Sequence, residues 1–303
     1  MALTELTDDL RNATLDKHVV RFSPHAHPRW STLRLQPIPR ILFRLYTPES
    51  DGFTNEHEAS SRDATAEEHL SDEDIFSTRT PEATAALIAD HLWWRKGPRR
   101  DNLVSWSSSI LFLIPYIFHR HHDNNDGSAL RDIRLLVVDT EKLPAHTFIR
   151  DIDLVSAFEE FDSREKEGLK HMARLRNKTH HYFGEYLSQG CLNISGKCST
   201  VSAQTMIDGG LFNIHDVFVA AYGGVQQATW VRSVHTARET IESASKLPQA
   251  PLEMVTSAFD IALEFGEDFR LPIAVQLLAL LPYALDPNSV YERLWAHMRP
   301  TSE

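Results

Sequence analysis

Apolar residues follow two patterns along the chain, short runs that are typical of buried strands and longer stretches with the spacing of a helix face. Strands are predicted at residues 40–47, 102–109, 134–139 and 198–203, with the start of a further strand at 148–153. Helices are predicted at residues 84–94, 110–121 and 164–181. Strands and helices mixed along the sequence in this way predict an α+β fold.

The last third of the chain is helical throughout. Its apolar pattern predicts helices at residues 217–246, 253–265, 273–285 and 290–297, divided by prolines. Pro37 and Pro39 mark the start of the mixed region. We therefore expect an N-terminal arm at residues 1–36, a compact α+β catalytic unit at 37–212 and an all-helical C-terminal subdomain at 213–303.

The charge of the chain is concentrated in one segment. The 303 residues carry a formal net charge of −11, and Glu49 to Phe76 contains ten acids against one base, which gives −9. This segment also has few large apolar residues, so we expect an acidic disordered insertion at residues 49–80. The rest of the chain carries only −2, so the acidic total does not exclude a nucleic-acid partner.

Two basic islands contrast with the acidic segment. The first lies beside Trp93 and Trp94, and the second, residues 164–181, carries a net charge of +4 with a basic stripe at helical spacing. Because Arg and Lys make most contacts to phosphate, both islands are candidate nucleic-acid surfaces, although a basic stripe is also typical of a solvated helix face. The candidate residues are Arg95, Lys96, Arg99, Arg100, Lys170, Arg174 and Lys178.

The sequence lacks the usual signals of several classes of protein. No apolar run is long enough to span a membrane and the first residues do not resemble a signal peptide, so we expect a cytoplasmic protein without a membrane partner. Cys191 and Cys198 are too few for a disulfide scaffold, and we expect buried thiols without a disulfide partner. The histidines at residues 119–122 lack metal-ligand spacing, so no metal site is expected. The chain also contains no GxSxG motif and no phosphate-binding glycine loop.

Three dispersed features remain as candidate chemistry. Arg44 lies in an otherwise apolar strand, where burial of its charge requires a partner, and a structural ion pair is the alternative to a functional role. Ser107 and Ser109 follow Trp106 at the end of the next strand, and they either cap the following helix or hold a ligand. Glu185 lies between aromatic residues, which predicts a partly buried carboxylate.

Taken in order, Arg40-Ile-Leu-Phe-Arg44, Trp106-Ser-Ser-Ser109 and Glu185-Tyr-Leu-Ser-Gln-Gly-Cys-Leu192 resemble the arginine, Ser-Thr-Ser and glutamate motifs of ADP-ribosyltransferase-like folds. The resemblance implies an NAD site in which Arg44 contacts a phosphate of the dinucleotide and Ser107 braces the site. It implies that Glu185 stabilises an oxocarbenium-like centre. Phe183 stands where members that modify arginine carry a second glutamate, so modification of protein arginine is not implied.

A second resemblance covers more of the chain. Residues 41–48, 102–109, 138–140 and 184–190, together with the helical tail, look like a large family of mostly uncharacterised proteins from filamentous fungi. We expect the arginine-containing cyclodipeptide synthases of fungal secondary metabolism to belong near this family. The resemblance implies a transferase that uses no cofactor and joins arginine from arginyl-tRNA to a residue from a second aminoacyl-tRNA.

In this second interpretation the basic islands contact the tRNA backbone. Asp151, Asp153 or Glu185 would hold the arginyl guanidinium, and Ser107, Ser109 and Glu185 would serve acyl transfer. Synthesis of cyclo(Arg-Xaa) is the leading prediction, ahead of ADP-ribosyl transfer from NAD and of an interaction protein that uses the helical tail. The second amino acid and the oligomeric state stay open.

Overall fold

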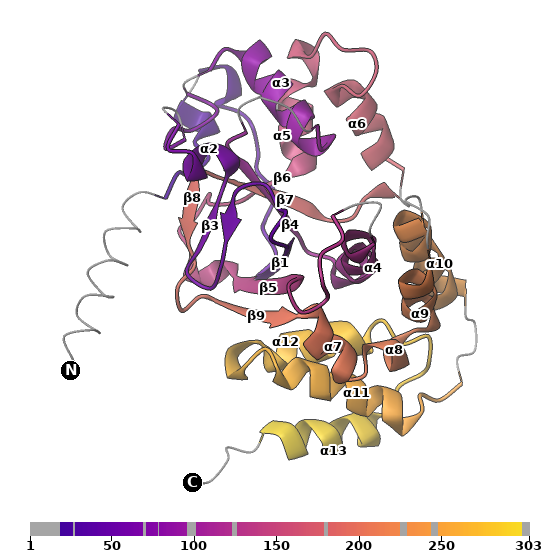
Figure 1. Ribbon diagram of the computed structural model, residues 1–303. Coiled ribbons are helices and arrows are strands. Elements are labelled where there is room, and N and C mark those ends of the chain that lie inside the picture. Colours follow the sequence, from indigo (N-terminus) through magenta and orange to yellow (C-terminus); the bar gives the residue numbers. More distant parts are fainter. Residues whose placement is uncertain are drawn as a thin grey trace, which may run out of the picture. The chain divides into compact units, whose positions relative to one another are not determined.

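The computed structural model describes residues 19–26, 28–68, 71–77, 79–95, 101–122, 126–178, 181–224, 229–243 and 248–298 (Figure 1). The chain forms two compact units. The first unit consists of Met1–Leu42, Ser50–Ser108 and Val138–Cys198, and the second of Phe43–Glu49, Ser109–Val137 and Ser199–Glu303. The units are therefore interleaved in sequence and differ from the consecutive blocks expected around residue 212, because segments far apart in the chain pair with one another.

Three strands of the first unit carry the residues of greatest interest. They lie in the order β6 (Ile149–Arg150), β7 (Glu185–Gln189) and β4 (Leu103–Ser107), with antiparallel neighbours. The register pairs Ser107 with Glu185, so the end of β4 lies beside the start of β7. A smaller antiparallel sheet has the order β2 (Phe53–Thr54), β3 (Glu58–Ser60) and β8 (Cys191–Asn193).

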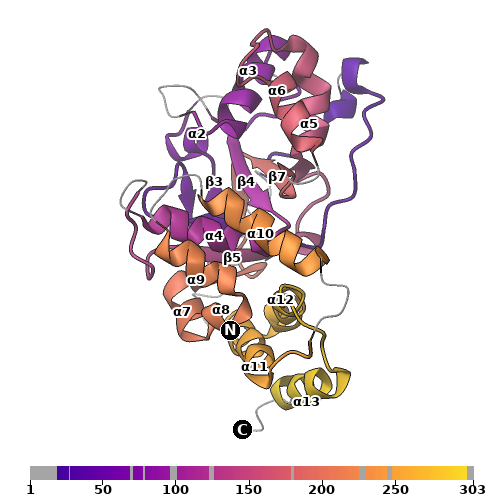
Figure 2. The ribbon, with the colours of Figure 1, turned by 90° about the vertical axis from the view of Figure 1, so that its right-hand side faces the viewer.

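Helices α3, α5 and α6 of the first unit lie beside one another (Figures 1 and 2). The side chain of Thr80 caps α3 by accepting a hydrogen bond from the Ala83 N–H, and Pro81 occupies the first turn, where proline is tolerated. The helix expected at 84–94 is therefore confirmed. The helical elements of this unit are η1 (Pro24–Ala26), η2 (Pro28–Trp30), α2 (Arg62–Thr65), α3 (Pro81–Leu92), η3 (Thr140–Lys142), α5 (Asp151–Phe158), η4 (Glu159–Phe161) and α6 (Leu169–Arg176).

Aromatic residues from distant segments form much of the core of the first unit. The ring of Phe76 lies 5.4 Å from that of Trp30 and 5.3 Å from that of Phe158, measured between centroids. Phe22 is also buried in this core. The described part of the expected N-terminal arm at residues 1–36 is therefore packed into this core, since Phe22 and Trp30 supply apolar surface that anchors it. The helix expected near residues 3–15 lies outside the described residues.

The acidic segment at residues 49–80 is folded over its described residues, which corrects the expectation of a disordered insertion. Two of its few large apolar side chains, those of Ile75 and Phe76, are buried. Its acids also have partners: a carboxylate oxygen of Asp63 accepts a hydrogen bond from the Asp101 N–H at 2.8 Å, and one of Asp74 accepts from the Ser23 N–H at 2.9 Å. The composition led to an underestimate of order, because carboxylates of this segment accept hydrogen bonds from backbone N–H groups of other segments.

The second unit contains most of each of three strands, in the order β1 (Ile41–Tyr46), β5 (Arg134–Asp139) and β9 (Cys198–Ser202), followed by a helical C-terminal region. Helix α11 packs against α8, α12 and α13, and α10 packs against α4 and α9. The helix expected at 217–246 is two helices, with residues 225–228 outside the described part. The helices are α4 (Ile110–His121), α7 (Ala203–Asp208), α8 (Leu211–Ile214), α9 (Asp216–Gly223), α10 (Thr229–Ser243), α11 (Leu252–Leu263), α12 (Glu267–Leu278) and α13 (Pro287–Met298).

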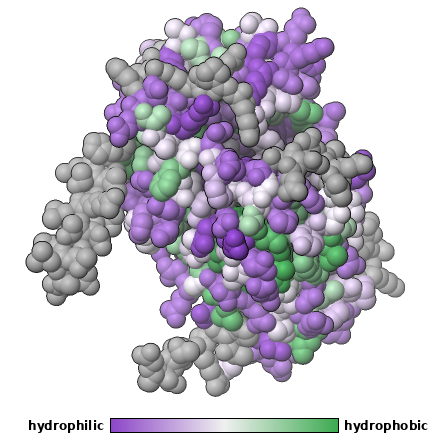
Figure 3. Space-filling model, in the orientation of Figure 1, coloured by the Kyte–Doolittle hydropathy of each residue, from purple (hydrophilic) through white to green (hydrophobic). Residues whose placement is uncertain are grey.

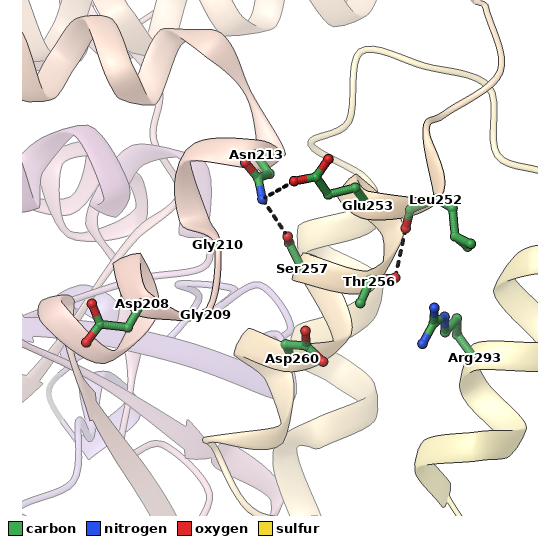
Figure 4. Close-up of a pocket in the computed structure, with 10 residues that line it drawn as sticks. All are labelled: Asp208, Gly209, Gly210, Asn213, Leu252, Glu253, Thr256, Ser257, Asp260 and Arg293. Carbon is green, nitrogen blue, oxygen red and sulfur yellow. Dashed lines mark hydrogen bonds between the residues drawn. The ribbon is translucent and has the colours of Figure 1, made fainter.

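An open groove of about 450 Å³ lies in the second unit (Figure 4). Asn213 lies at its edge and donates a hydrogen bond to Ser257 Oγ at 3.0 Å. The lining includes the acids Asp208, Glu253 and Asp260, with Arg293 on α13. None of the residues singled out from the sequence lines this groove.

Hydrophilic side chains cover most of the face shown in Figure 3, and the hydrophobic ones gather in a smaller area. The most exposed large hydrophobic residues include Tyr291 and Trp295 on α13. Within the described residues, no helix has both the length and the apolar character needed to cross a membrane. Cys191 and Cys198 are free thiols.

If the acidic segment is part of the core, Phe76→Ala will lower the free energy of unfolding by about 3–5 kcal/mol, because it removes a buried aromatic side chain. Phe53→Ala, in the same segment but with 46% of Phe53 exposed, is the matched control and will cost about 1 kcal/mol or less. Urea denaturation followed by tryptophan fluorescence measures both. Equal and small effects would contradict the packing of this segment.

Candidate active site

A continuous chain of polar side chains links five elements of the first unit. Asp101, His91, Ser105, Glu185, Arg176 and Asp151 contact one another in that order, and we call these six residues the polar chain. They come from the segment before β4, from α3, β4, β7, α6 and α5. Residues so distant in sequence are brought together by the β4–β7 pairing and by the packing of the three helices.

One half of the polar chain is an aspartate, histidine and serine in series. Asp101 Oδ2 lies 2.7 Å from His91 Nδ1, and His91 Nε2 lies 2.8 Å from Ser105 Oγ. The imidazole is mostly buried, with 11% of its surface exposed. Both ring nitrogens therefore have a polar partner, which fixes the orientation of the ring.

The other half holds Glu185 by both carboxylate oxygens. Ser105 Oγ donates a hydrogen bond to Glu185 Oε1 at 2.9 Å, and Arg176 Nη2 donates to Glu185 Oε2. Arg176 Nε forms an ion pair with Asp151 Oδ2 at 2.9 Å. One guanidinium is thus shared by two carboxylates, and the carboxylate of Glu185 is held in a fixed orientation.

Burial perturbs the acids and phenols around this site. Asp151 is fully buried, and desolvation raises its pKa to about 7, with the charge of Glu185 acting in the same direction and that of Arg176 opposing it. Desolvation also raises the pKa of Tyr182 and Tyr186. A perturbed carboxylate beside a second carboxylate is a common property of functional sites.

The serines predicted to act have partners outside the polar chain. Ser107 is buried, and its hydroxyl donates to the backbone oxygen of Phe183 at 2.9 Å, so it supports the segment that leads into β7. Ser109 accepts a hydrogen bond from the Phe112 N–H at 3.2 Å, which confirms the helix-capping alternative for this residue. The serine that contacts Glu185 is Ser105.

Gly184 sets the backbone position of Glu185, the residue that follows it. Its φ is +65°, a conformation that favours glycine, and a Cβ at this position would lie 2.1 Å from Ser108 Oγ. The Ser108 N–H donates to the Gly184 carbonyl at 2.8 Å. The close approach of β4 to this turn therefore sets the position of the glutamate backbone.

The acids predicted to bind a substrate guanidinium are paired with arginines of the chain itself. Asp151 contacts Arg176, and Asp153 Oδ1 lies 2.7 Å from Arg150 Nη2. Asp153 also accepts a hydrogen bond from the Gln36 N–H at 3.2 Å. A substrate guanidinium would have to displace these partners, so neither carboxylate is available to bind it in this structure.

Arg44 lies in β1 of the second unit, with 9% of the residue exposed, and is not without partners. The expectation that its buried charge meets an ion-pair partner or a ligand stays a prediction. Because Arg44 belongs to the second unit, it is described separately from the polar chain.

The residues of the two basic islands differ in their exposure and in whether they already form ion pairs. Lys170 and Arg174 are exposed on α6 and Lys178 is exposed just after it, although α6 ends at Arg176, short of the helix expected to residue 181. Arg95 forms ion pairs with Asp90 at 3.2 Å and with Glu167 at 3.0 Å. Lys96, Arg99 and Arg100 lie outside the described residues.

His91, Asp101, Ser105 and Arg176 were not singled out from the sequence. The alternation of Ser105 and Ser107 along a predicted strand places both on one face and is the signal that indicates Ser105. His91 and Asp101 give no comparable signal, because a ten-residue separation across a helix end has no characteristic pattern. Among the described residues, no group of three or more His, Cys, Asp or Glu side chains is placed to hold a metal ion.

A family model described as "Domain of unknown function (DUF7587)" matches residues 37–195. The chain belongs to this family. The matched region contains every residue of the polar chain as well as Arg44. Neither the curated proteins nor the solved structures gave a match.

The raised pKa of Asp151 predicts how stability depends on pH. Between about pH 4 and pH 7 folded Asp151 retains a proton that the unfolded chain has lost, so the contribution of this group to stability falls as pH rises. Asp151→Asn removes the contribution, and the free energy of unfolding of the variant minus that of the wild type will therefore increase from pH 4 to pH 7. Denaturation at a series of pH values tests this, with the exposed Asp132→Asn as control for the loss of a carboxylate. A difference that does not change with pH would contradict the assignment.

Proposed function

We propose that the protein transfers an ADP-ribosyl group from NAD and that Glu185 is its catalytic carboxylate. The observation that carries the proposal is the fixed carboxylate of Glu185, with Ser105 on one oxygen and Arg176 on the other. Glu185 lies at the start of a strand and 16% of its side chain is exposed, so it is held firmly without being sealed from a substrate.

Departure of nicotinamide leaves positive charge on the anomeric carbon and ring oxygen of the ribose. A preoriented carboxylate stabilises such a centre more than water does, because it need not reorganise as the charge develops. Arg176 is shared with Asp151, so the three groups together carry one negative charge when both acids are ionised. The guanidinium therefore orients Glu185 without cancelling the negative charge of the group.

The proposal changes one role that the motif resemblance implies. Ser105 lies two residues before Ser107 on β4 and would hold the carboxylate of Glu185. Ser107 would hold the segment that precedes Glu185 through its hydrogen bond to the Phe183 carbonyl. Phe183 in place of a second glutamate favours an acceptor other than protein arginine.

Release of nicotinamide from labelled NAD, measured by chromatography with protein and nucleic-acid acceptors, tests this function. Glu185→Gln will lower kcat by about 100-fold or more while leaving the fold intact, because it removes the charge that acts in the transition state. Glu160→Gln, at an exposed glutamate on η4, is the matched control and will retain wild-type activity. Absence of nicotinamide release from folded wild-type protein with every acceptor class would contradict the proposal.

The second candidate function is tRNA-dependent synthesis of an arginine-containing cyclodipeptide. The observation that favours it is the arrangement of α6, which carries exposed Lys170 and Arg174 and ends at Arg176, the partner of Glu185. A phosphate backbone bound along the exposed face of α6 would therefore approach the polar chain. An arginine-containing cyclic dipeptide in the medium of a bacterial expression host, absent from an empty-vector control, would favour this function over NAD chemistry.

The two functions also differ in their need for RNA binding. If α6 binds an RNA backbone, combined reversal of Lys170, Arg174 and Lys178 to glutamate will weaken tRNA binding, and the slope of log affinity against log salt will become shallower by up to about 2–3. Fluorescence anisotropy with labelled tRNA measures both quantities. Arg174→Glu alone and Arg131→Glu, at a side chain that is 82% exposed in the second unit, each change the net charge by −2, so this pair controls for net charge. Equal effects of the two changes would contradict a specific role for α6.

A further inference from the structure

The path of polar contacts continues beyond Glu185 to side chains that the proposed reaction has not used. Ser105 Oγ lies between Glu185 Oε1, at 2.9 Å, and His91 Nε2, at 2.8 Å. His91 Nδ1 in turn lies 2.7 Å from Asp101 Oδ2. The exposed fraction of the side chain is 16% for Glu185, 11% for His91 and 28% for Asp101, so the path ends at a side chain more exposed than the carboxylate where it starts.

We propose that Ser105, His91 and Asp101 form a proton relay that removes the proton which Glu185 receives during group transfer. The inference rests on the proposed function for the source of that proton. It assigns His91 as a relay residue and Asp101 as the residue that positions it, roles that act on the reaction through Glu185.

The steps of the reaction balance without a further reactant. The acceptor oxygen or nitrogen bonds to the anomeric carbon, and the bond to nicotinamide breaks with its electron pair going to nicotinamide. The acceptor's proton passes to Glu185. Glu185 then donates it to Ser105 Oγ while the hydroxyl proton of Ser105 moves to His91 Nε2, which restores the carboxylate and leaves an imidazolium beside Asp101. The imidazolium releases this proton to solvent before the next turnover.

Each member of the path has the chemistry that this transfer needs. A serine hydroxyl donates and accepts at once, so it can pass a proton between two bases. Arg176 stays protonated and cannot accept a proton from Glu185, and its hydrogen bond holds the carboxylate in place, so the proton must leave through the other oxygen. In the relay Asp101 accepts a hydrogen bond from Nδ1–H of His91, so the lone pair of Nε2 faces Ser105, whose hydroxyl turns from Glu185 Oε1 to Nε2 as Glu185 becomes the donor.

The charges around His91 come from every element that brings the polar chain together. Asp101 faces it directly, Glu185 on β7 lies beyond Ser105, and Arg176 on α6 and Asp151 on α5 follow. A proton that arrives on His91 is therefore stabilised by the adjacent carboxylate of Asp101. Once the imidazole is protonated it cannot accept another proton, so the relay predicts activity that falls at low pH.

The tautomer of His91 tests the relay without any substrate. The full chain labelled with 15N-histidine contains sixteen imidazoles, and comparison with the spectrum of His91→Gln identifies the His91 signals. The relay predicts a proton on Nδ1 and none on Nε2 at pH 8. A proton on Nε2 at that pH, in either the neutral or the charged ring, would overturn it.

Enzyme kinetics provide a second test of the relay. His91→Gln will lower kcat for nicotinamide release about tenfold or more and abolish the fall in activity at low pH, with KM for NAD unchanged. Ser105→Ala will do the same and Ser105→Thr, which retains the hydroxyl, will recover most of the rate. His171→Gln, at a ring that lies 5.0 Å from that of Trp93 and is not a member of the polar chain, is the control. Unchanged kcat and pH profile in His91→Gln would overturn the relay, whereas absence of NAD turnover in the wild type would overturn the proposed function and leave the tautomer to decide the relay.

Discussion

The guanidinium of Arg176 joins the elements on which the candidate site depends. It comes from the last residue of α6, forms an ion pair with Asp151 at the start of α5 and donates to Glu185 at the start of β7. All three side chains are mostly buried, so loss of the cation would leave two carboxylates facing each other with little water. The position of Glu185 and the contact of α6 with α5 both involve this one shared charge, whereas the pKa of Asp151 is raised by desolvation against the effect of Arg176.

The backbone contributes the other constraint. The antiparallel register of β4 and β7 and the positive φ of Gly184 bring the end of one strand against the start of the other. Ser105 and Ser107 then face the same side of β4, where one reaches the carboxylate of Glu185 and the other the carbonyl of Phe183. The result is a carboxylate with few accessible orientations, which is what stabilisation of a developing charge requires.

Local periodicity predicted much of the fold but not the partners of the site residues. The strand at residues 134–139 and the helix at 110–121 were predicted with the bounds that the structure shows, because each depends on a pattern within a few residues. Glu185 was singled out, yet its contacts with Ser105 and Arg176 depend on pairing across the sheet and on the end of α6, which sequence spacing does not encode. The acidic segment was misjudged for a similar reason, since Phe76 meets Trp30 and Phe158 from distant parts of the chain.

A double-mutant cycle between Arg176 and Glu185 tests whether the guanidinium holds the carboxylate. The free energy of unfolding would be measured by denaturation for the wild type, Arg176→Met, Glu185→Gln and the double variant, with Glu160→Gln in place of Glu185→Gln as the control cycle. Because Arg176 donates to Glu185, we expect a coupling free energy of about 1–3 kcal/mol for this pair and additivity within about 0.5 kcal/mol for Arg176 with Glu160. Additivity in both cycles would show that Arg176 does not hold Glu185.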